Sequence, residues 1–161
     1  MIRVLLVDDQ ALFRAGIRML LASQPDLEVV GEANDGVQAI AQWRATRPDV
    51  ILMDIRMPNM DGIEASAAIL QEAVMADAAA PPRILMLTTF DLDEAAARAI
   101  RGGASGFLLK DAEPESLLSS IRTVHAGNAV IAASATRQLF EHFGGARGVA
   151  STPPQWNLLT E

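Results

Sequence analysis

The stretch "RVLLVDDQ", residues 3–10, joins an apolar run directly to two adjacent carboxylates. The run from Val4 to Val7 predicts a buried β-strand that ends at Asp8 and Asp9. Two like charges about 4 Å apart repel by about 1 kcal/mol in water and by about 4 kcal/mol near a protein surface. This arrangement therefore predicts that another group compensates the repulsion at the end of the strand.

Short apolar runs alternate with helical patterns along most of the chain. Strands are expected at 3–7, 27–33, 49–53, 83–89 and 105–110, and helices at 11–23, 36–46, 61–75, 93–100 and 114–127. Strict alternation predicts a parallel sheet with helices on both faces. The predicted fold class is therefore α/β: a flavodoxin-like, doubly wound, five-stranded parallel sheet with strand order 2-1-3-4-5. Segment 27–33, which carries Glu28 and Glu32, suits an edge strand.

The composition suggests one domain with a short appendage. Residues 1–128 are predicted to form the domain, 129–143 a short additional helix, and 144–161 a linker rich in Gly, Pro, Ser and Thr. The net charge of −7 argues against this chain gripping a nucleic-acid backbone by itself. There is no cysteine to form disulfides, and no apolar run is long enough to span a membrane, so a soluble, cytoplasmic protein is expected.

Polar residues lie at the carboxyl ends of four of the five predicted strands. Asp8 and Asp9 end the first strand, Asp54 the third, Thr88 and Thr89 the fourth, and Lys110 the fifth. Lys110 is the only lysine among 13 basic residues. In parallel α/β sheets, ligands bind beyond the carboxyl ends of the strands. Three carboxylates, a hydroxyl group and the single lysine are therefore expected at one edge of the sheet.

These residue types suggest phosphoryl chemistry. Clustered carboxylates need a counter-charge, and a divalent cation with hard oxygen ligands, Mg²⁺, would supply it. Asp54 would then act as a nucleophile that forms an acyl phosphate. Lys110 and the Thr88 hydroxyl group would hold the phosphoryl oxygens.

Each residue also has an ordinary structural explanation. An Asp after a strand is often only a helix N-cap, Thr88 is a common strand residue, and Lys110 could simply be solvated. What favours a site is that all of them are expected at the same edge of the sheet.

Together, "VDDQ", "DIRMPNMDG", "LTTFD" and "GFLLKD" resemble the receiver domain of two-component response regulators. "GASGFLLKD" and "AGNAVIAASATRQL" resemble, more narrowly, the NarL/FixJ (LuxR-type) class of transcriptional regulators. The resemblance extends from residue 2 to about 143. It implies that Asp54 is the phosphoacceptor and that Asp9, supported by Asp8, binds Mg²⁺ together with Asp54 and the backbone carbonyl group of Arg56. Thr88 and Lys110 would contact the phosphoryl group, and Phe107 would be the aromatic switch residue.

The resemblance also implies partners. A sensor histidine kinase would phosphorylate Asp54, and phosphorylation would favour a homodimer. The final "LTE" resembles the opening of a LuxR-type helix-turn-helix domain, so we expect DNA binding to belong to a longer parent protein. A stand-alone receiver that acts through protein partners is the alternative. The chain would be a signalling module and not an enzyme acting on other substrates.

Two other functions fit less well. A phosphatase of the haloacid-dehalogenase type also uses an Asp nucleophile and Mg²⁺, but it places a second acid two positions after the first, where this chain has Gln10. A flavodoxin-like cofactor carrier would need a phosphate-binding loop after the first strand, and none follows it here.

Overall fold

The computed structural model describes residues 1–76, 81–89, 103–128 and 130–131. The predicted helices at 93–100 and 129–143 and the linker at 144–161 lie almost entirely outside the described residues. The described elements, in chain order, are β1 (Ile2–Val7), α1 (Ala11–Ala22), β2 (Leu27–Ala33), α2 (Gly36–Thr46), β3 (Val50–Asp54), α3 (Gly62–Met75), β4 (Arg83–Thr88), β5 (Gly106–Leu109), α5 (Pro114–His125) and β6 (Val130–Ile131).

All strand pairs of the sheet are parallel, and the predicted order 2-1-3-4-5 is confirmed. One strand was not predicted: the two-residue β6 pairs with β5 and extends the sheet to six strands. Two residues are too few to show the alternation by which a strand is recognised in a sequence. Strand β3 also differs by one residue at each end, so Asp54 is the last residue of the strand.

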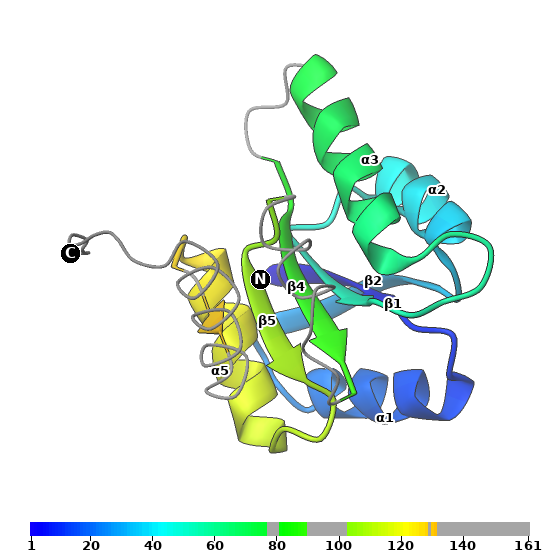
Figure 1. The fold of residues 1–161 in the computed structure, drawn as a ribbon. Coiled ribbons are helices and arrows are strands. Elements are labelled where there is room, and N and C mark those ends of the chain that lie inside the picture. The colour runs from blue at the N-terminus through cyan, green and yellow to red at the C-terminus, as the bar shows by residue number, and fades with distance from the viewer. Residues whose placement is uncertain (77–80, 90–102, 129, 132–161) are drawn as a thin grey trace, which may run out of the picture.

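Side chains of successive strand residues enter different cores. Val4 and Leu6 pack with α1 and α5, whereas Leu5 and Val7 pack with α2 and α3. Figure 1 shows the resulting three layers, with α2 and α3 on one face of the sheet and α1 and α5 on the other. Both faces are covered, which explains why the inner strands are almost continuously apolar.

Strand β2 lies at the edge of the sheet, as its acidic residues predicted. Glu28 is exposed, and Glu32 forms ion pairs with Arg14 at 3.0 Å and with Arg18 at 2.7 Å. These pairs connect α1 to the edge strand.

The helix starts carry specific local contacts. Asp61 caps α3 and forms a capping box with Glu64. Asp35 caps α2 by accepting a hydrogen bond from the Gln38 N–H group at 2.8 Å. Helix α5 has Pro in its first turn. In the part of the chain that the structure describes, we find no helix with both the length and the apolar composition needed to cross a bilayer.

Candidate functional site

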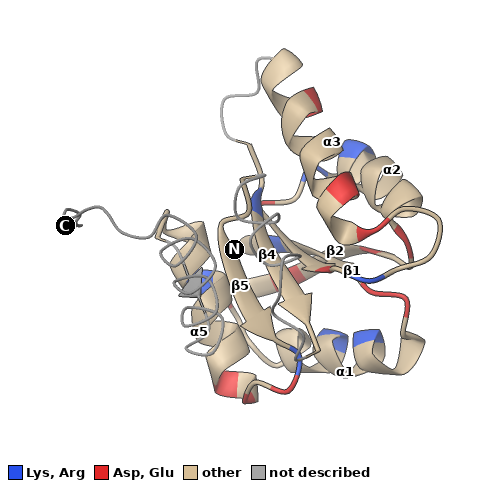
Figure 2. Cartoon of the chain, in the orientation of Figure 1, with Lys and Arg blue, Asp and Glu red and all other residues tan. Residues whose placement is uncertain are grey.

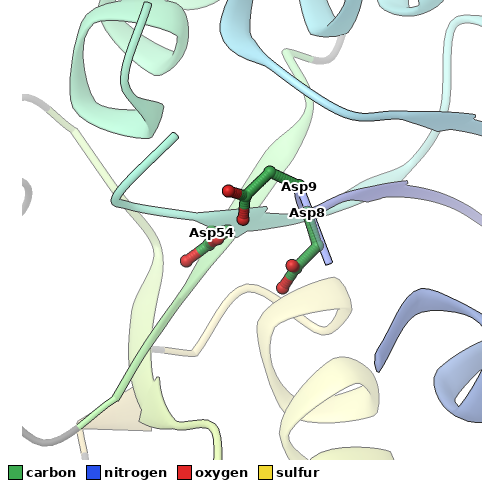
Figure 3. A group of neighbouring side chains, drawn as sticks. All are labelled: Asp8, Asp9 and Asp54. Atoms are coloured by element: carbon green, nitrogen blue, oxygen red, sulfur yellow. The ribbon is translucent and has the colours of Figure 1, made fainter. Parts of the chain in front are cut away.

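Three carboxylates meet at the carboxyl edge of the sheet. Asp8 and Asp9 directly follow β1, and Asp54 ends the adjacent strand β3, in which Met53 is the partner of Val7. One carboxylate oxygen from each Asp lies within 4.8 Å of the other two. Figure 3 shows the three side chains gathered at this point. Parallel pairing of β1 with β3 therefore produces the cluster that the strand ends predicted.

The two adjacent acids differ in their surroundings. Asp8 is only 2% exposed, and its Oδ1 accepts a hydrogen bond from the Gln10 N–H group at 2.8 Å. Its backbone carbonyl group accepts a hydrogen bond from Arg14. Asp9, in contrast, is exposed. The N-cap of α1 is Gln10, so the capping explanation considered for Asp8 and Asp9 is wrong.

Lys110 brings one positive charge to the cluster. Its Nζ lies 2.6 Å from Oδ2 of Asp8 and 3.4 Å from Oδ2 of Asp54. Lys110 is fixed beside β4 by a 2.6 Å hydrogen bond from its N–H group to the carbonyl group of Thr88. The ammonium group also donates to Oε1 of Gln10 at 3.0 Å and lies 4.7 Å from the centre of the Phe13 ring. One ammonium group cannot neutralise three carboxylates.

The imbalance appears in the pKa of Asp54. The pKa of Asp54 is raised from 3.8 to about 7, chiefly by burial and next by the charge of Asp8, while Lys110 opposes both effects. Asp8 Oδ2, although it faces the ammonium group, accepts no well-aligned hydrogen bond within the described residues. Additional positive charge at this point would therefore favour the ionised form of Asp54.

A pocket of about 200 Å³ opens beside Asp54, and we call it the acidic pocket. Its walls are formed by seven residues: Asp9, Gln10, Asp54, Arg56, Thr88, Thr89 and Lys110. Five of the residues proposed from the sequence thus line one pocket. Asp8 lies behind it, against Lys110. Phe107 lies apart, fully buried in the core that also contains Met86.

The loop between β3 and α3 is held at several points. The Ile55 N–H group donates to the Leu87 carbonyl group at 3.2 Å, and the Gly62 N–H group donates to that of Ile55 at 2.8 Å. At the far end, the Asn59 side chain donates to Oδ2 of Asp35 at 2.8 Å, and the Gly36 N–H group donates to the Met60 carbonyl group at 3.0 Å. Arg56 is therefore carried by a loop anchored on both sides.

Glycine at position 62 is required by a close approach. A Cβ atom placed there would overlap the backbone carbonyl oxygen of Asp54. Real Cβ atoms are not found this close to backbone oxygen. In the motif "DIRMPNMDG", Asp61 thus caps α3, and Gly62 lets the helix start directly beside the site.

The acidic cluster fits a hard divalent cation. It offers one carboxylate oxygen from each of three residues, all within 4.8 Å of one another, and one of these residues, Asp9, is exposed. Mg²⁺ prefers oxygen ligands and keeps several waters, so a few protein ligands beside an open pocket suit it.

The family model of the response regulator receiver domain matches residues 4–122 of this chain. The chain belongs to this family. The matched range contains every residue of the acidic pocket.

Relatives of this receiver domain are transcriptional regulators. The protein YxjL of Bacillus subtilis (strain 168), named an uncharacterised transcriptional regulatory protein, is 46% identical over 129 residues, which are 80% of this chain and 56% of YxjL. The nitrate/nitrite response regulator NarL of Escherichia coli (strain K12) is 34% identical over 157 residues, which are 98% of this chain and 69% of NarL. The chain thus spans little more than half the length of YxjL.

A solved structure agrees with this class. A LuxR-family two-component response regulator from Aurantimonas sp. SI85-9A1 superposes with a TM-score of 0.79 at 32% identity, covering 88% of this chain and 97% of that chain. The resemblance to the NarL/FixJ (LuxR-type) class is therefore confirmed.

Sequence reasoning missed the residues that position Lys110 and Asp8 in this receiver domain. The Gln10 side chain, the Phe13 ring and Arg14 all contact one of these two groups. Gln10 and Arg14 gave no separate signal, and Phe13 fitted the apolar face of its helix equally well. Only their position at the N-cap and in the first turn of α1, just after the two acids, pointed toward the site.

Proposed function

We propose that Asp54 accepts a phosphoryl group from a sensor histidine kinase with Mg²⁺ bound beside it. The observation that carries this proposal is the acidic pocket, where Thr88 and Lys110 line one space with Asp54, whose carboxylate clusters with those of Asp8 and Asp9. Membership in the receiver family supports the same chemistry.

Asp9, Asp54 and the backbone carbonyl group of Arg56 would hold the cation, with Asp8 acting in support. Asp9 is exposed and lines the acidic pocket, whereas Asp8 is buried and already engaged by Gln10 and Lys110. This difference supports direct metal contact by Asp9 and an indirect role for Asp8. Bound Mg²⁺ would supply positive charge for the phosphoryl oxygens.

In the transfer, a carboxylate oxygen of Asp54 attacks the phosphorus atom and forms an acyl phosphate. The bond between phosphorus and the histidine nitrogen of the kinase breaks, and its electron pair stays on that nitrogen. Lys110 and the Thr88 hydroxyl group then hold phosphoryl oxygens. Lys110 has the reach for this because its ammonium group already lies 3.4 Å from Asp54.

The output is a switch and not turnover of other substrates. Thr88 would move toward the phosphoryl group. Its pairing partner on β5 is Leu109, and Phe107 lies two positions earlier on that strand. Phe107 would respond to the movement of Thr88. The population would shift toward a packing that favours a homodimer, and DNA would be bound through a helix-turn-helix domain of the parent protein. A cytoplasmic location belongs to the same proposal.

Intact-mass measurement after incubation with a small phosphodonor and Mg²⁺ tests the proposal. The wild-type chain should gain one phosphoryl group, and Asp54→Asn should gain none. Asp61→Asn is the matched control, since it changes an Asp outside the acidic pocket and keeps a capping side chain. Equal phosphorylation of Asp54→Asn and wild type would refute the assignment.

A further inference from the structure

A second pocket, of about 210 Å³, lies at the opposite, amino-terminal edge of the sheet. It is formed where α2 and α5 end and where β4 begins. Its walls are Trp43, Arg47, Pro48, Asp49, Ala73, Pro81, Pro82, Arg83 and His125. We call it the basic pocket, because three of these side chains are basic or can become so and only one is acidic.

Four arginines of the described residues have carboxylate partners elsewhere. Arg14 and Arg18 pair with Glu32, Arg44 pairs with Glu72, and Arg122 pairs with Asp26. Arg47 and Arg83 form no ion pair within the described ranges, and both line the basic pocket. In a chain of net charge −7, the convergence of uncompensated cations in one pocket calls for a partner.

Arg47 is held in place by its backbone and by an aromatic ring. Its φ of 47° is left-handed, and its N–H group donates to the carbonyl group of Trp43. The guanidinium carbon lies 4.3 Å from the centre of the Trp43 ring. The Arg47 carbonyl group in turn accepts a 2.7 Å hydrogen bond from Arg3. Arg47 therefore presents its charge from a fixed position with little freedom left to lose on binding.

The ends of the two helices account for only part of the charge. Helix carbonyl groups favour cations at the last turn, which explains Arg47 after α2 and His125 at the end of α5. Arg83 begins a strand and has no such role. Its Nη2 lies 3.8 Å from the position that a Cβ atom of Gly127 would take, so its guanidinium group reaches the end of α5.

The single acid of the basic pocket is already occupied. Oδ2 of Asp49 accepts a 2.9 Å hydrogen bond from the Arg3 N–H group, which fixes the carboxylate against β1. Figure 2 shows Asp or Glu in the segment between β1 and α1, and Lys or Arg where β4 begins.

We propose that the basic pocket binds a small oxyanion, a phosphate or carboxylate group held by Arg83 and Arg47 with His125 beside them. Guanidinium groups bind both kinds of group through paired hydrogen bonds. Drug-sized ligands occupy pockets of about 300 to 1,000 Å³, so this smaller space suits inorganic phosphate or a short organic acid. The proposal is independent of phosphorylation at Asp54.

Trp43 provides a direct probe. The chain contains two tryptophans, so Trp156→Phe leaves Trp43 as the only one. Phosphate and succinate are titrated separately at constant ionic strength, with EDTA present and potassium chloride as the reference salt. We expect a saturable change in Trp43 emission, and the anion that binds more tightly identifies the ligand class.

Arg83→Gln should weaken this binding about tenfold or more, because it removes a charged hydrogen-bond donor. Its side chain has no partner in the described structure, so the variant should fold normally. Arg18→Gln, on α1, is the control and should bind like the parent. His125→Gln is a second variant that should weaken binding by a smaller factor. An emission change that chloride reproduces, that does not saturate, or that persists unchanged in Arg83→Gln would overturn the proposal.

Discussion

The ammonium nitrogen of Lys110 lies closer to Asp8, at 2.6 Å, than to Asp54, at 3.4 Å. In this state the lysine chiefly neutralises the buried acid behind the acidic pocket. To hold a phosphoryl oxygen on Asp54, Lys110 must share its charge between Asp8 and the new group. A cation at the carboxylates would compensate Asp8 as Lys110 turns away.

Lys110→Met should destabilise the metal-free protein at pH 8 by about 3 kcal/mol, because it leaves buried carboxylates without their counter-charge. Mg²⁺ should restore more stability to this variant than to wild type. Urea unfolding with and without Mg²⁺ measures both effects. Gln10→Ala is the control, as it removes only a neutral partner of Lys110 and should cost about 1 kcal/mol. Equal stability of Lys110→Met and wild type without Mg²⁺ would contradict the ion-pair assignment.

Asp54 should make the metal-free protein less stable as the pH rises. Its pKa is about 7 in the folded protein against an ordinary value of 3.8, so the folded state binds more protons than the unfolded chain between these values. The free energy of unfolding therefore falls through this window, by at most about 1.4 kcal/mol per pH unit from this group. Asp54→Asn should lose this component and be more stable than wild type at pH 8. Parallel stability curves of the two proteins would count against the raised pKa.

Mg²⁺ affinity should depend on pH in the opposite sense. The cation binds ionised carboxylates, so its affinity should be nearly constant above pH 7 and fall by up to about tenfold per pH unit below it. Calorimetric titration at several pH values measures this. Asp9→Asn should weaken binding at every pH, while Glu28→Gln, an exposed acid on β2, should leave it unchanged. An affinity that does not change between pH 6 and 8 would show that Asp54 is not a ligand.

Gly62→Ala should destabilise the protein by about 2 kcal/mol or more, because its Cβ would overlap the carbonyl oxygen of Asp54. Gly16→Ala is a matched control within α1, where nothing apart from the adjoining helix backbone lies within 4 Å of the new Cβ. That variant should gain about 0.5 to 1 kcal/mol from its higher helix propensity. Thermal unfolding of both variants measures the contrast, and similar losses in the two would refute the close contact.

The sequence predicted the sheet order and the content of the acidic pocket because both depend on patterns of many residues. Continuous apolar strands indicated burial on both faces, and parallel strands necessarily bring their carboxyl ends together. The different surroundings of Asp8 and Asp9 could not be predicted with the same detail. It depends on the Gln10 N–H group and on the distance to Lys110, which only the packed fold determines. The basic pocket was missed for the same reason, since Arg47, Arg83 and His125 lie far apart in the chain and follow no motif.

The anchoring of the loop between β3 and α3 bears on the entropy of metal binding. Its hydrogen bonds to Leu87, Asp35 and Gly36 already restrict the backbone on both sides of Arg56. The conformational entropy of this loop is therefore lost mainly when the protein folds and only to a small extent when a cation arrives. Removing the hydrogen bond from the Asn59 side chain to Asp35 would leave more of this conformational entropy to be lost when the cation binds. Such a protein would keep every proposed metal ligand and still bind the cation more weakly.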